Sequence, residues 1–439
     1  MGAKWITGFC ALCAAAMLPA TVQAELTAAE QAIDTTVEAQ YGYHVALLEK
    51  LTNQNSGTRN IEGNRAVMAM LRPEFERLGF RVEIVDQSEV GRAGHFFAIR
   101  EGNGQGRKML LIAHTDTVFE ADSNFQTFVR NGDTATGPGI GDDKGGIIII
   151  LAALRAMQVA GTLEGADIVV AITGDEEDAG DPISISRADL VRWGQWADVA
   201  LDFEGLSVQD GRDMGVVARR SSNSWELRTT GRSGHSSGIF SENAGDGAIF
   251  ELARIIARFR EELPEPNLTF NVGLISGGAR VELHETGLHT AASGKTNIIP
   301  AMALARGDFR TLSEEQSERV RNRMRAIVAD HLPRTEASIT FDEGSYPPMA
   351  PTEGNRALLA ELNAINRDLG LAEQPELDPL KRGAGDVSFV AKYVDALAGM
   401  GTAGSGAHSE RETVHLPSIK RQAKRAAILM SRLAQQTSD

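Results

Sequence analysis

The stretch that decides the fold begins with Met109-Leu-Leu-Ile-Ala-His114-Thr-Asp116 and ends with Gly137-Pro-Gly-Ile-Gly-Asp142-Asp143-Lys144-Gly-Gly146. The first part is an apolar run of strand length that ends in a histidine and an aspartate. The second part is a glycine-rich turn with two aspartates, and a long apolar segment follows it. Open α/β sheets place their functional residues outside the carboxyl ends of their strands. The stretch therefore predicts a buried strand, an acidic turn and a helix at one edge of a sheet.

The length and the charge of the chain limit the classes of protein to consider. A chain of 439 residues is too long for one compact domain, so we expect two domains. The formal net charge of −15 argues against nucleic acid as a partner, because phosphate binding needs clustered lysine and arginine. The same charge is consistent with several carboxylates gathered around cations.

Residues 1–24 have the pattern of a secretory signal peptide. Lys4 supplies the positive start, residues 5–18 form the apolar core, and Val22-Gln-Ala24 is a small-residue cleavage site. A membrane anchor is the weaker alternative, because the apolar run is shorter than the ~20 residues that a span needs. We therefore expect a periplasmic or secreted protein whose mature chain has no membrane span.

The predicted mature chain contains no cysteine, since Cys10 and Cys13 both lie in the signal peptide. A chain of this size can enter an oxidising compartment without disulfides. Thiolate nucleophiles and cysteine-ligated zinc are thereby excluded. Any metal ion must be held by histidine, aspartate and glutamate.

Strand and helix patterns alternate along most of the chain. The amphipathic segments 26–51 and 65–78 are predicted helices, and 147–157 is apolar nearly all round, as a buried helix would be. The predicted strands lie at 81–85, 95–100, 109–113, 167–173 and 199–203. This alternation favours an α/β domain with a doubly wound, mostly parallel sheet.

The pattern changes near Gly215. Strands at 224–230, 268–276, 298–310 and 337–341 and helices at 244–259 and 313–332 follow a ferredoxin-like α+β order. After Pro347 the alternation of helix and strand returns, and a strand at 396–400 leads towards His408. We therefore predict a catalytic domain built from 25–214 and 347–439, with an α+β domain, 215–346, inserted into it.

Acidic and imidazole side chains follow the predicted strands of the larger domain. A parallel sheet would bring these strand ends to one edge, although they are widely separated in sequence. A set that is rich in carboxylate and free of sulfur suits two zinc ions that share a bridging carboxylate. The candidates are His114, Asp116, Asp142, Glu176, Glu177, either Asp202 or Glu204, and His408.

Each motif taken alone has an ordinary structural explanation. Aspartates before a helix can be caps, and Glu176-Glu177 can be a solvated acidic loop. Two further motif matches are accidental. Gly-His-Ser-Ser-Gly at 234–238 fits the serine-hydrolase pattern but lies in the inserted domain, without an ordered acid and histidine after it. Gly-Met-Gly-Thr-Ala-Gly at 399–404 fits a dinucleotide fingerprint, but no helix opens there.

Taken in order, the motifs resemble those of the co-catalytic zinc exopeptidases and deacylases that include bacterial glutamate carboxypeptidase, aminoacylase and succinyl-diaminopimelate desuccinylase. The likeness covers essentially the mature chain and rests on five ordered motifs. The run at 137–146 looks closest to the glutamate carboxypeptidase branch. The resemblance implies that the inserted domain is a lid or dimerisation domain. It allows a homodimer through that domain without requiring one.

The resemblance also implies a role for each metal ligand. Asp142, which fits the spacing G-x-G-x-x-D-x-K, would bridge two zinc ions, and cobalt or manganese would suit the same ligands. Glu204 would share one ion with His114, and Asp202 is its competitor because some relatives carry Leu-Asp at this point. The implied metal ligands are His114, Asp142, Glu177, Glu204 and His408.

Other residues match the positions at which the family carries out chemistry. Glu176 would be the general base, and Asp116 would orient His114 through its second ring nitrogen. His235 of the inserted domain would reach the active site and stabilise an oxyanion. Asn297 and Arg310 would contact the substrate.

The resemblance implies a zinc-dependent exopeptidase that hydrolyses a peptide or amide bond next to a free carboxylate. Glu176 would take a proton from a water that bridges the two ions and pass it to the leaving amine. An N-acyl-amino-acid deacylase with the same site and a different pocket is the alternative. A non-catalytic metal- or peptide-binding protein is a third hypothesis, against which the intact Glu176 argues, because a binder has no use for a base.

Overall fold

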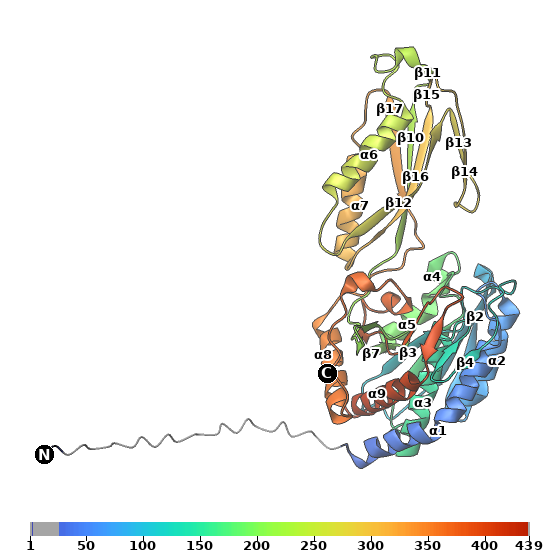
Figure 1. Cartoon of the computed structure of the whole chain (residues 1–439), viewed down its shortest axis with the longest axis vertical. Helices are drawn as coiled ribbons and strands as arrows, with labels where there is room; N and C mark the ends of the chain where they lie inside the picture. The colour runs from blue at the N-terminus through green and yellow to red at the C-terminus, as the bar shows by residue number, and fades with distance from the viewer. Residues whose placement is uncertain (1, 3–25, 438–439) are drawn as a thin grey trace.

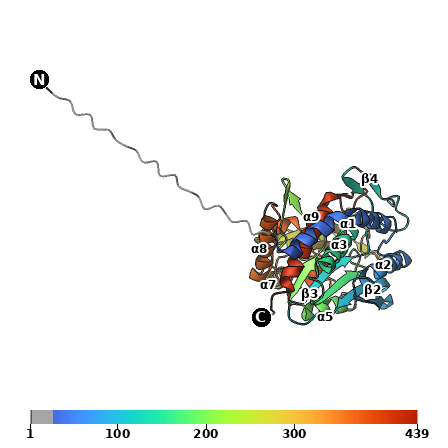
Figure 2. The ribbon, with the colours of Figure 1, turned by 90° about the horizontal axis from the view of Figure 1, so that it is seen from below.

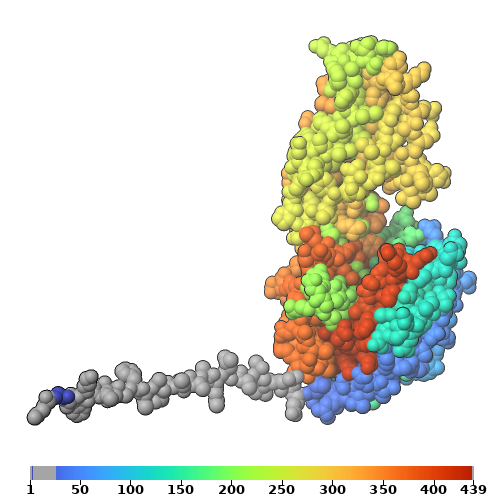
Figure 3. All heavy atoms as spheres, in the orientation of Figure 1, coloured from blue at the N-terminus to red at the C-terminus, as the bar shows by residue number. Residues whose placement is uncertain are grey.

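The computed structural model describes Gly2 and residues 26–437, which form two lobes (Figure 1). Apart from Gly2, the predicted signal peptide lies outside the described residues. The lower lobe combines the beginning and the end of the chain, and the middle of the chain forms the upper lobe (Figure 3). Among the residues that the structure describes, no helix has the length and apolar character to cross a membrane.

The lower lobe is built on a six-stranded sheet in the order β1-β2-β6-β3-β7-β18. β3 pairs in parallel with β6 and β7, β18 pairs in parallel with β7, and β1 and β2 add an antiparallel edge. The predicted α/β fold with a mostly parallel sheet is therefore confirmed. The strands are β1 (Arg81–Gln87), β2 (Arg92–Arg100), β3 (Met109–His114), β6 (Ile168–Thr173), β7 (Val199–Asp202) and β18 (Asp395–Leu397).

Helices cover both faces of this sheet. α1 (Ala28–Thr52), α3 (Lys144–Ala160) and α9 (Pro417–Leu433) lie side by side on one face of it (Figure 2). Leu111 of β3 faces this side, whereas its neighbours Leu110 and Ile112 belong to a second core on the opposite face. Alternation along each strand thus supplies both cores. The other helices of this lobe are α2 (Ile61–Glu76), α4 (Ile183–Ser186), α5 (Ala188–Trp196) and α8 (Glu353–Asp368).

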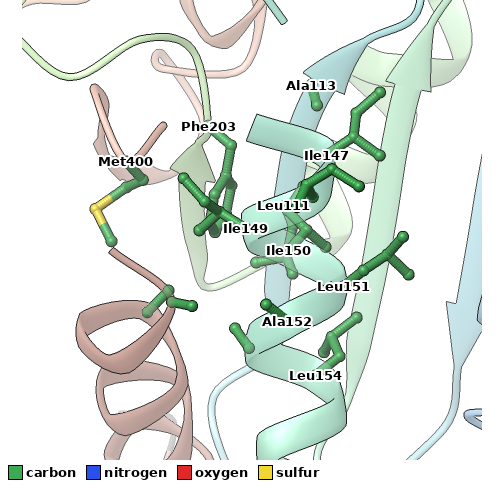
Figure 4. Close-up of a cluster of buried hydrophobic side chains, with 14 of the residues drawn as sticks. Leu111, Ala113, Ile147, Ile149, Ile150, Leu151, Ala152, Leu154, Phe203 and Met400 are labelled. Atoms are coloured by element: carbon green, nitrogen blue, oxygen red, sulfur yellow. The ribbon is translucent and has the colours of Figure 1, made fainter. Parts of the chain in front are cut away.

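α3 is the buried helix that the apolar run predicts. Its isoleucines belong to one buried cluster with Leu111 and Ala113 of β3 and with Phe203 and Met400 (Figure 4). Burial of each such side chain contributes about 1.5–3 kcal/mol. Because α3 begins at Lys144, directly after the two aspartates, this core holds the acidic turn at the edge of the sheet.

The upper lobe has the predicted ferredoxin-like order. Its antiparallel sheet runs β12-β16-β10-β17, and two helices pack on one face around Trp225 and Phe309. The elements are β10 (Asn223–Gly231), α6 (Ala248–Glu262), β12 (Thr269–Gly278), β16 (Met302–Arg310), α7 (Glu314–Val328) and β17 (Thr335–Phe341).

Two details of this lobe differ from the predictions. The expected strand 298–310 is two strands, β15 (Ile298–Ile299) and β16, separated at Pro300, whose nitrogen carries no hydrogen for a ladder. A hairpin of β13 (Arg280–Leu283) and β14 (Thr290–Ser293) was not predicted at all. β15 pairs instead with the short strand β11 (Gly234–His235).

The chain crosses between the lobes twice, and the two crossings pair with each other. Arg219 forms an isolated antiparallel β-bridge with Met349, and Ser222 forms one with Tyr346. The predicted domain boundaries, 214/215 and 346/347, stay predictions. Val216 still pairs with Ala398 of the lower lobe, and the sheet of the upper lobe begins only at β10.

A small four-stranded sheet carries the loop that contains His408. Its order is β19-β20-β5-β4, so the segment before the C-terminal helix pairs with the hairpin that precedes the acidic turn. Its strands are β4 (Val129–Asn131), β5 (Thr134–Thr136), β19 (Gly404–Ser405) and β20 (Thr413–His415). A two-stranded ribbon, β8 (Val208–Gln209) with β9 (Arg212–Asp213), completes the lower lobe.

Candidate metal and catalytic site

His114, the last residue of β3, lies buried between two aspartates. Its Nδ1 is 3.3 Å from Oδ1 of Asp116, and its Nε2 is 3.2 Å from Oδ1 of Asp142. A hydrogen on Nδ1 leaves Nε2 free to bind a metal. The geometry thus agrees with the predicted orienting role of Asp116, which stays a prediction about function.

Asp116 also fixes the acidic pair that follows β6. Its Oδ1 accepts a hydrogen bond of 3.0 Å from the backbone amide of Glu176, and its Oδ2 accepts one of 3.0 Å from that of Glu177. The hydroxyl of Thr58 donates a third bond, of 2.7 Å, to Oδ2. One buried carboxylate therefore sets the relative positions of His114, Glu176 and Glu177.

Asp142, Glu177 and His408 converge on one point. Nε2 of His408 lies 3.3 Å from Oδ2 of Asp142 and 3.0 Å from Oε2 of Glu177. Within the described part of the chain, this is the one group of three potential ligand residues whose donor atoms lie within 4.8 Å of one another. These residues come from three predicted motifs, and the structure brings them together.

The spacing of these atoms fits zinc. Two ligands about 2.1 Å from a tetrahedral ion lie about 3.4 Å apart, close to the separations around His408. The same spacing recurs between His114 and Asp142, so Asp142 presents one oxygen to each histidine. His408 also has a positive φ of 62°, which is costly for a residue with a side chain and is most frequent at functional sites.

Glu204 lines the same cavity as Asp142 but faces two arginines. Its Oε2 lies 2.7 Å from Arg219 and 3.3 Å from Arg382, and its Oε1 is buried without a hydrogen-bond partner. The competing Asp202 has its Oδ2 3.0 Å from Arg219. Because Glu204 keeps a free oxygen, the geometry favours it as a ligand. No contact joins it to His114, so the assignment stays a prediction.

Burial and neighbouring charges shift the acids of the site in different directions. Burial, followed by the charge of Glu204, raises the pKa of Glu176 well above its usual value. Although burial opposes it, hydrogen bonds with His114 and His408 lower the pKa of Asp142. Two carboxyl groups whose pKa values are pushed apart suit different tasks, one as a proton carrier and the other as a permanent anion.

Glu412 is a site residue that sequence reasoning missed. It is buried, and its carboxylate accepts hydrogen bonds from the backbone amides of Gly139 (3.0 Å), Gly141 (2.7 Å) and Asp142 (3.0 Å). It therefore closes the acidic turn against the loop of His408. Nothing in the local pattern distinguishes it from the exposed Glu410, so no sequence signal would have found it.

A cavity of about 170 Å³ lies beside these residues. Its walls include Asp142, Glu204, Thr402 and the segment 404–407. Arg382 also lines it and is the second residue that sequence reasoning missed. A guanidinium group on the wall of an otherwise acidic cavity offers a place for an anion.

The three predicted residues of the inserted domain are not gathered with the others. β11, which contains His235, and the neighbouring β15 lie at the end of the upper lobe that is farthest from the six-stranded sheet (Figure 1). Asn297 is exposed beside them, and its carbonyl accepts a hydrogen bond of 3.0 Å from the amide of Ser236. Arg310, at the end of β16, lies near the junction of the lobes, where a Cβ at Gly383 would be 3.2 Å from its Nη1.

Comparisons with known proteins extend over most of the chain. The family model described as "Peptidase family M20/M25/M40" matches residues 110–432. Carboxypeptidase G2 of Pseudomonas sp. (strain RS-16) is 26% identical over 397 residues, which cover 88% of each chain. Succinyl-diaminopimelate desuccinylase of Rhizorhabdus wittichii is 28% identical over 364 residues, which cover 80% of this chain and 88% of the relative.

Solved structures show the same fold. The crystal structure of aminopeptidase PepT from Bacillus cereus superposes with a TM-score of 0.71 at 16% sequence identity. The superposition covers 90% of this chain and 99% of that chain. The fold of this chain is therefore also found in a peptidase of known structure.

Proposed function

We propose, on the premise that this chain belongs to peptidase family M20/M25/M40, that it is a zinc-dependent exopeptidase. Membership makes it a metallopeptidase or amidohydrolase, and the proposal adds that the bond cleaved lies next to a free carboxylate. The observation that carries the proposal is the convergence of Asp142, Glu177 and His408 beside Glu176. A binding protein would need the ligands but not the adjacent base.

Two ions would be held by the metal-ligand candidates described above. Glu177 and His408 would hold one ion and His114 and Glu204 the other, with Asp142 shared between them. Bound zinc supplies a Lewis acid and lowers the pKa of water towards neutrality. The ligands offer only nitrogen and oxygen, so cobalt or manganese would also be accepted.

Glu176 is the group that we assign to proton transfer. Its backbone is fixed by Asp116, and its carboxyl group lies among the metal-ligand candidates with a raised pKa. Glu176 removes the proton from the attacking water and gives it to the leaving amine. A positioned base of this kind contributes about 10²–10⁴ in rate.

The position of Arg382 supports the proposal that the substrate carries a free carboxylate. It lines the cavity together with Asp142, and its nearest acidic partner is Glu204 at 3.3 Å. An anionic substrate would be repelled by the carboxylates of this cavity unless a cation received it. Arg310, whose Nη1 would lie 3.2 Å from a Cβ at Gly383, adds positive charge next to the segment of Arg382.

An N-acyl-amino-acid deacylase is the second candidate. The observation that favours it is the 28% identity with a succinyl-diaminopimelate desuccinylase over 88% of that relative. The same metal ligands and the same base would serve both reactions. The two candidates differ in the acyl group that the cavity must accept.

Two further proposals concern the state of the protein in the cell. Residues 1–24 support export to the periplasm or the medium, which the N-terminal sequence of protein recovered from each fraction would test.

The exposed Phe240 and Phe250 support a homodimer through the inserted domain, which light scattering would test. Because β11 is remote from the site within one chain, His235 needs a second copy, or a reoriented lobe, to act there.

The test of the proposed function uses mature protein that has been stripped of metal and then reloaded with zinc. Release of free amino acid is followed from dipeptides, peptides with C-terminal glutamate and N-acyl amino acids. Release that depends on zinc and is fastest for peptides supports the exopeptidase. Faster release from N-acyl amino acids favours the deacylase, and no release in the presence of two bound ions contradicts both.

A further inference from the structure

We propose that Tyr346 is a positioning residue for Glu176. Tyr346 ties the catalytic base to the segment that joins the two lobes. The proposal rests on the function proposed above for Glu176. It goes beyond that function because Tyr346 belongs neither to the metal ligands nor to the sequence motifs. In the chain, Tyr346 lies between β17 and α8 and belongs to neither element.

Tyr346 lies on the return crossing from the upper lobe to the lower one. Its backbone amide donates to the carbonyl of Ser222 at 3.0 Å, and the amide of Ser222 donates back at 3.0 Å. Arg219 and Met349 form an equivalent pair, with two bonds of 2.9 Å. The two crossings therefore move together, and any rotation of the upper lobe about them carries Tyr346.

The side chain of Tyr346 points away from this crossing into the lower lobe. Its hydroxyl donates a hydrogen bond of 2.8 Å to the backbone carbonyl of Glu176 and accepts one of 2.9 Å from Nη2 of Arg187. Its ring packs edge-on against Phe389, with centroids 4.8 Å apart. The hydroxyl is thus held by a hydrogen bond from a cation, and the ring is held by a second aromatic side chain.

Arg187 is itself held by a buried network with complementary charges. Its guanidinium contacts Asp175 at 2.6 Å and Asp386 at 2.7 Å, and all three side chains are almost fully buried. Asp386 also accepts a bond of 2.6 Å from the hydroxyl of Thr173, the last residue of β6. A buried charge network in which every member is paired is rigid, because breaking one pair leaves a charge without a partner.

The backbone of Glu176 is therefore held from both ends. Its amide is bonded to Asp116, which also holds His114, and its carbonyl is bonded to Tyr346. The first bond ties the base to the metal-ligand candidates, and the second ties it to the junction of the lobes. A displacement of about 1 Å at a reacting group can cost 10²-fold in rate, so this second tie has kinetic consequences.

The substitution that tests this is Tyr346→Phe, which removes the hydroxyl and keeps the ring. Tyr43→Phe is the matched control, because the hydroxyl of Tyr43 also donates to an acceptor, Glu74 at 2.7 Å, and accepts from an arginine, Arg155 at 3.3 Å. We expect Tyr346→Phe to lower kcat about tenfold with unchanged KM and zinc content. We expect Tyr43→Phe to keep the parental kcat.

Hydrogen exchange gives a readout that does not depend on activity. Amides of residues 174–178 should exchange faster in Tyr346→Phe than in the parent or in Tyr43→Phe, while those of α3 exchange as in the parent. If the parent hydrolyses no substrate, the proposed function fails, and exchange still decides whether Tyr346 holds this segment. Parental exchange in residues 174–178 overturns the positioning role, whatever happens to kcat.

A double-mutant cycle with Glu176→Asp separates positioning from a general loss of stability. If Tyr346 acts through Glu176, the combined loss in kcat should be at least fivefold smaller than the product of the single losses. Losses that simply multiply would mean that the two residues act independently. Faster exchange with a parental kcat would likewise overturn the catalytic consequence.

Discussion

Glu412 accepts a hydrogen bond of 3.0 Å from the backbone amide of Asp142. The same carboxylate accepts two further bonds from amides of the acidic turn, so it holds Asp142 in place although it is not itself one of the predicted metal ligands. The loop that supplies Glu412 also supplies His408. Glu412 thereby links the acidic turn to the loop of His408, so it constrains the distance between two metal-ligand candidates.

Replacing Glu412 by glutamine should weaken metal binding. The amide group of glutamine brings hydrogens towards the three backbone donors, and at least one of them loses its acceptor. Loss of such a partner to a metal ligand typically costs 10–100-fold in affinity. Zinc titration against a competing chelator would measure the change, and Glu410→Gln, at an exposed position, should bind zinc as the parent does.

Glu176→Gln should keep both metal ions and lose nearly all turnover. Glutamine preserves the shape of the side chain but cannot accept and return a proton, so a loss in kcat of about 10²–10⁴ is expected. Atomic emission would measure the metal content, and kcat on the best substrate would measure the loss of turnover. Substantial turnover in this variant would assign the base elsewhere.

Glu204→Gln and Asp202→Asn should have different effects on the metal content. Both carboxylates contact Arg219, but Glu204 keeps one buried oxygen without a partner, whereas the second oxygen of Asp202 accepts from the backbone amide of Glu204. We therefore expect Glu204→Gln to lose one of two bound ions, and Asp202→Asn to keep both while its thermal unfolding temperature falls. The reverse pattern would make Asp202 the ligand.

His44 should make stability depend on pH well away from the site. It is buried in α1, its Nε2 has no hydrogen-bond partner, and burial lowers its pKa from 6.5 to about 4. Between these values the unfolded chain binds a proton that the folded chain excludes. Its contribution is therefore present above pH 6.5 and is lost as the pH falls towards 4.

The size of this effect follows from the shift in the pKa of His44. At about pH 4.5 the parent should have lost roughly 2–3 kcal/mol that His44→Gln does not lose. Urea unfolding at pH 7 and at pH 4.5 measures the difference between the two proteins. An equal loss of stability in both would show that His44 is not the group responsible.

Local sequence determined the elements that carry most of the site. The apolar run before His114 specifies a buried strand, and the apolar run after Asp143 specifies a buried helix, because each buries its side chains against the same core. Strand ends in a parallel sheet share one edge, and this reasoning predicted the place of Glu177 after β6. Asp142 and His408 reach the same edge through the separate four-stranded sheet, which the sequence did not reveal. The ferredoxin-like order of the inserted domain was also readable, because its hydrophobic periodicity is local.

Only the tertiary structure decided which residues support that site and which stay remote from it. The bond of Tyr346 to Glu176 and the bonds of Glu412 to the acidic turn join segments that no periodic pattern links. The place of Arg382 on the cavity wall, and the distance of β11 from the sheet, likewise depend on how whole elements pack. Such contacts join single side chains across long sequence separations, whereas hydrophobic patterning records only which face of each element is buried.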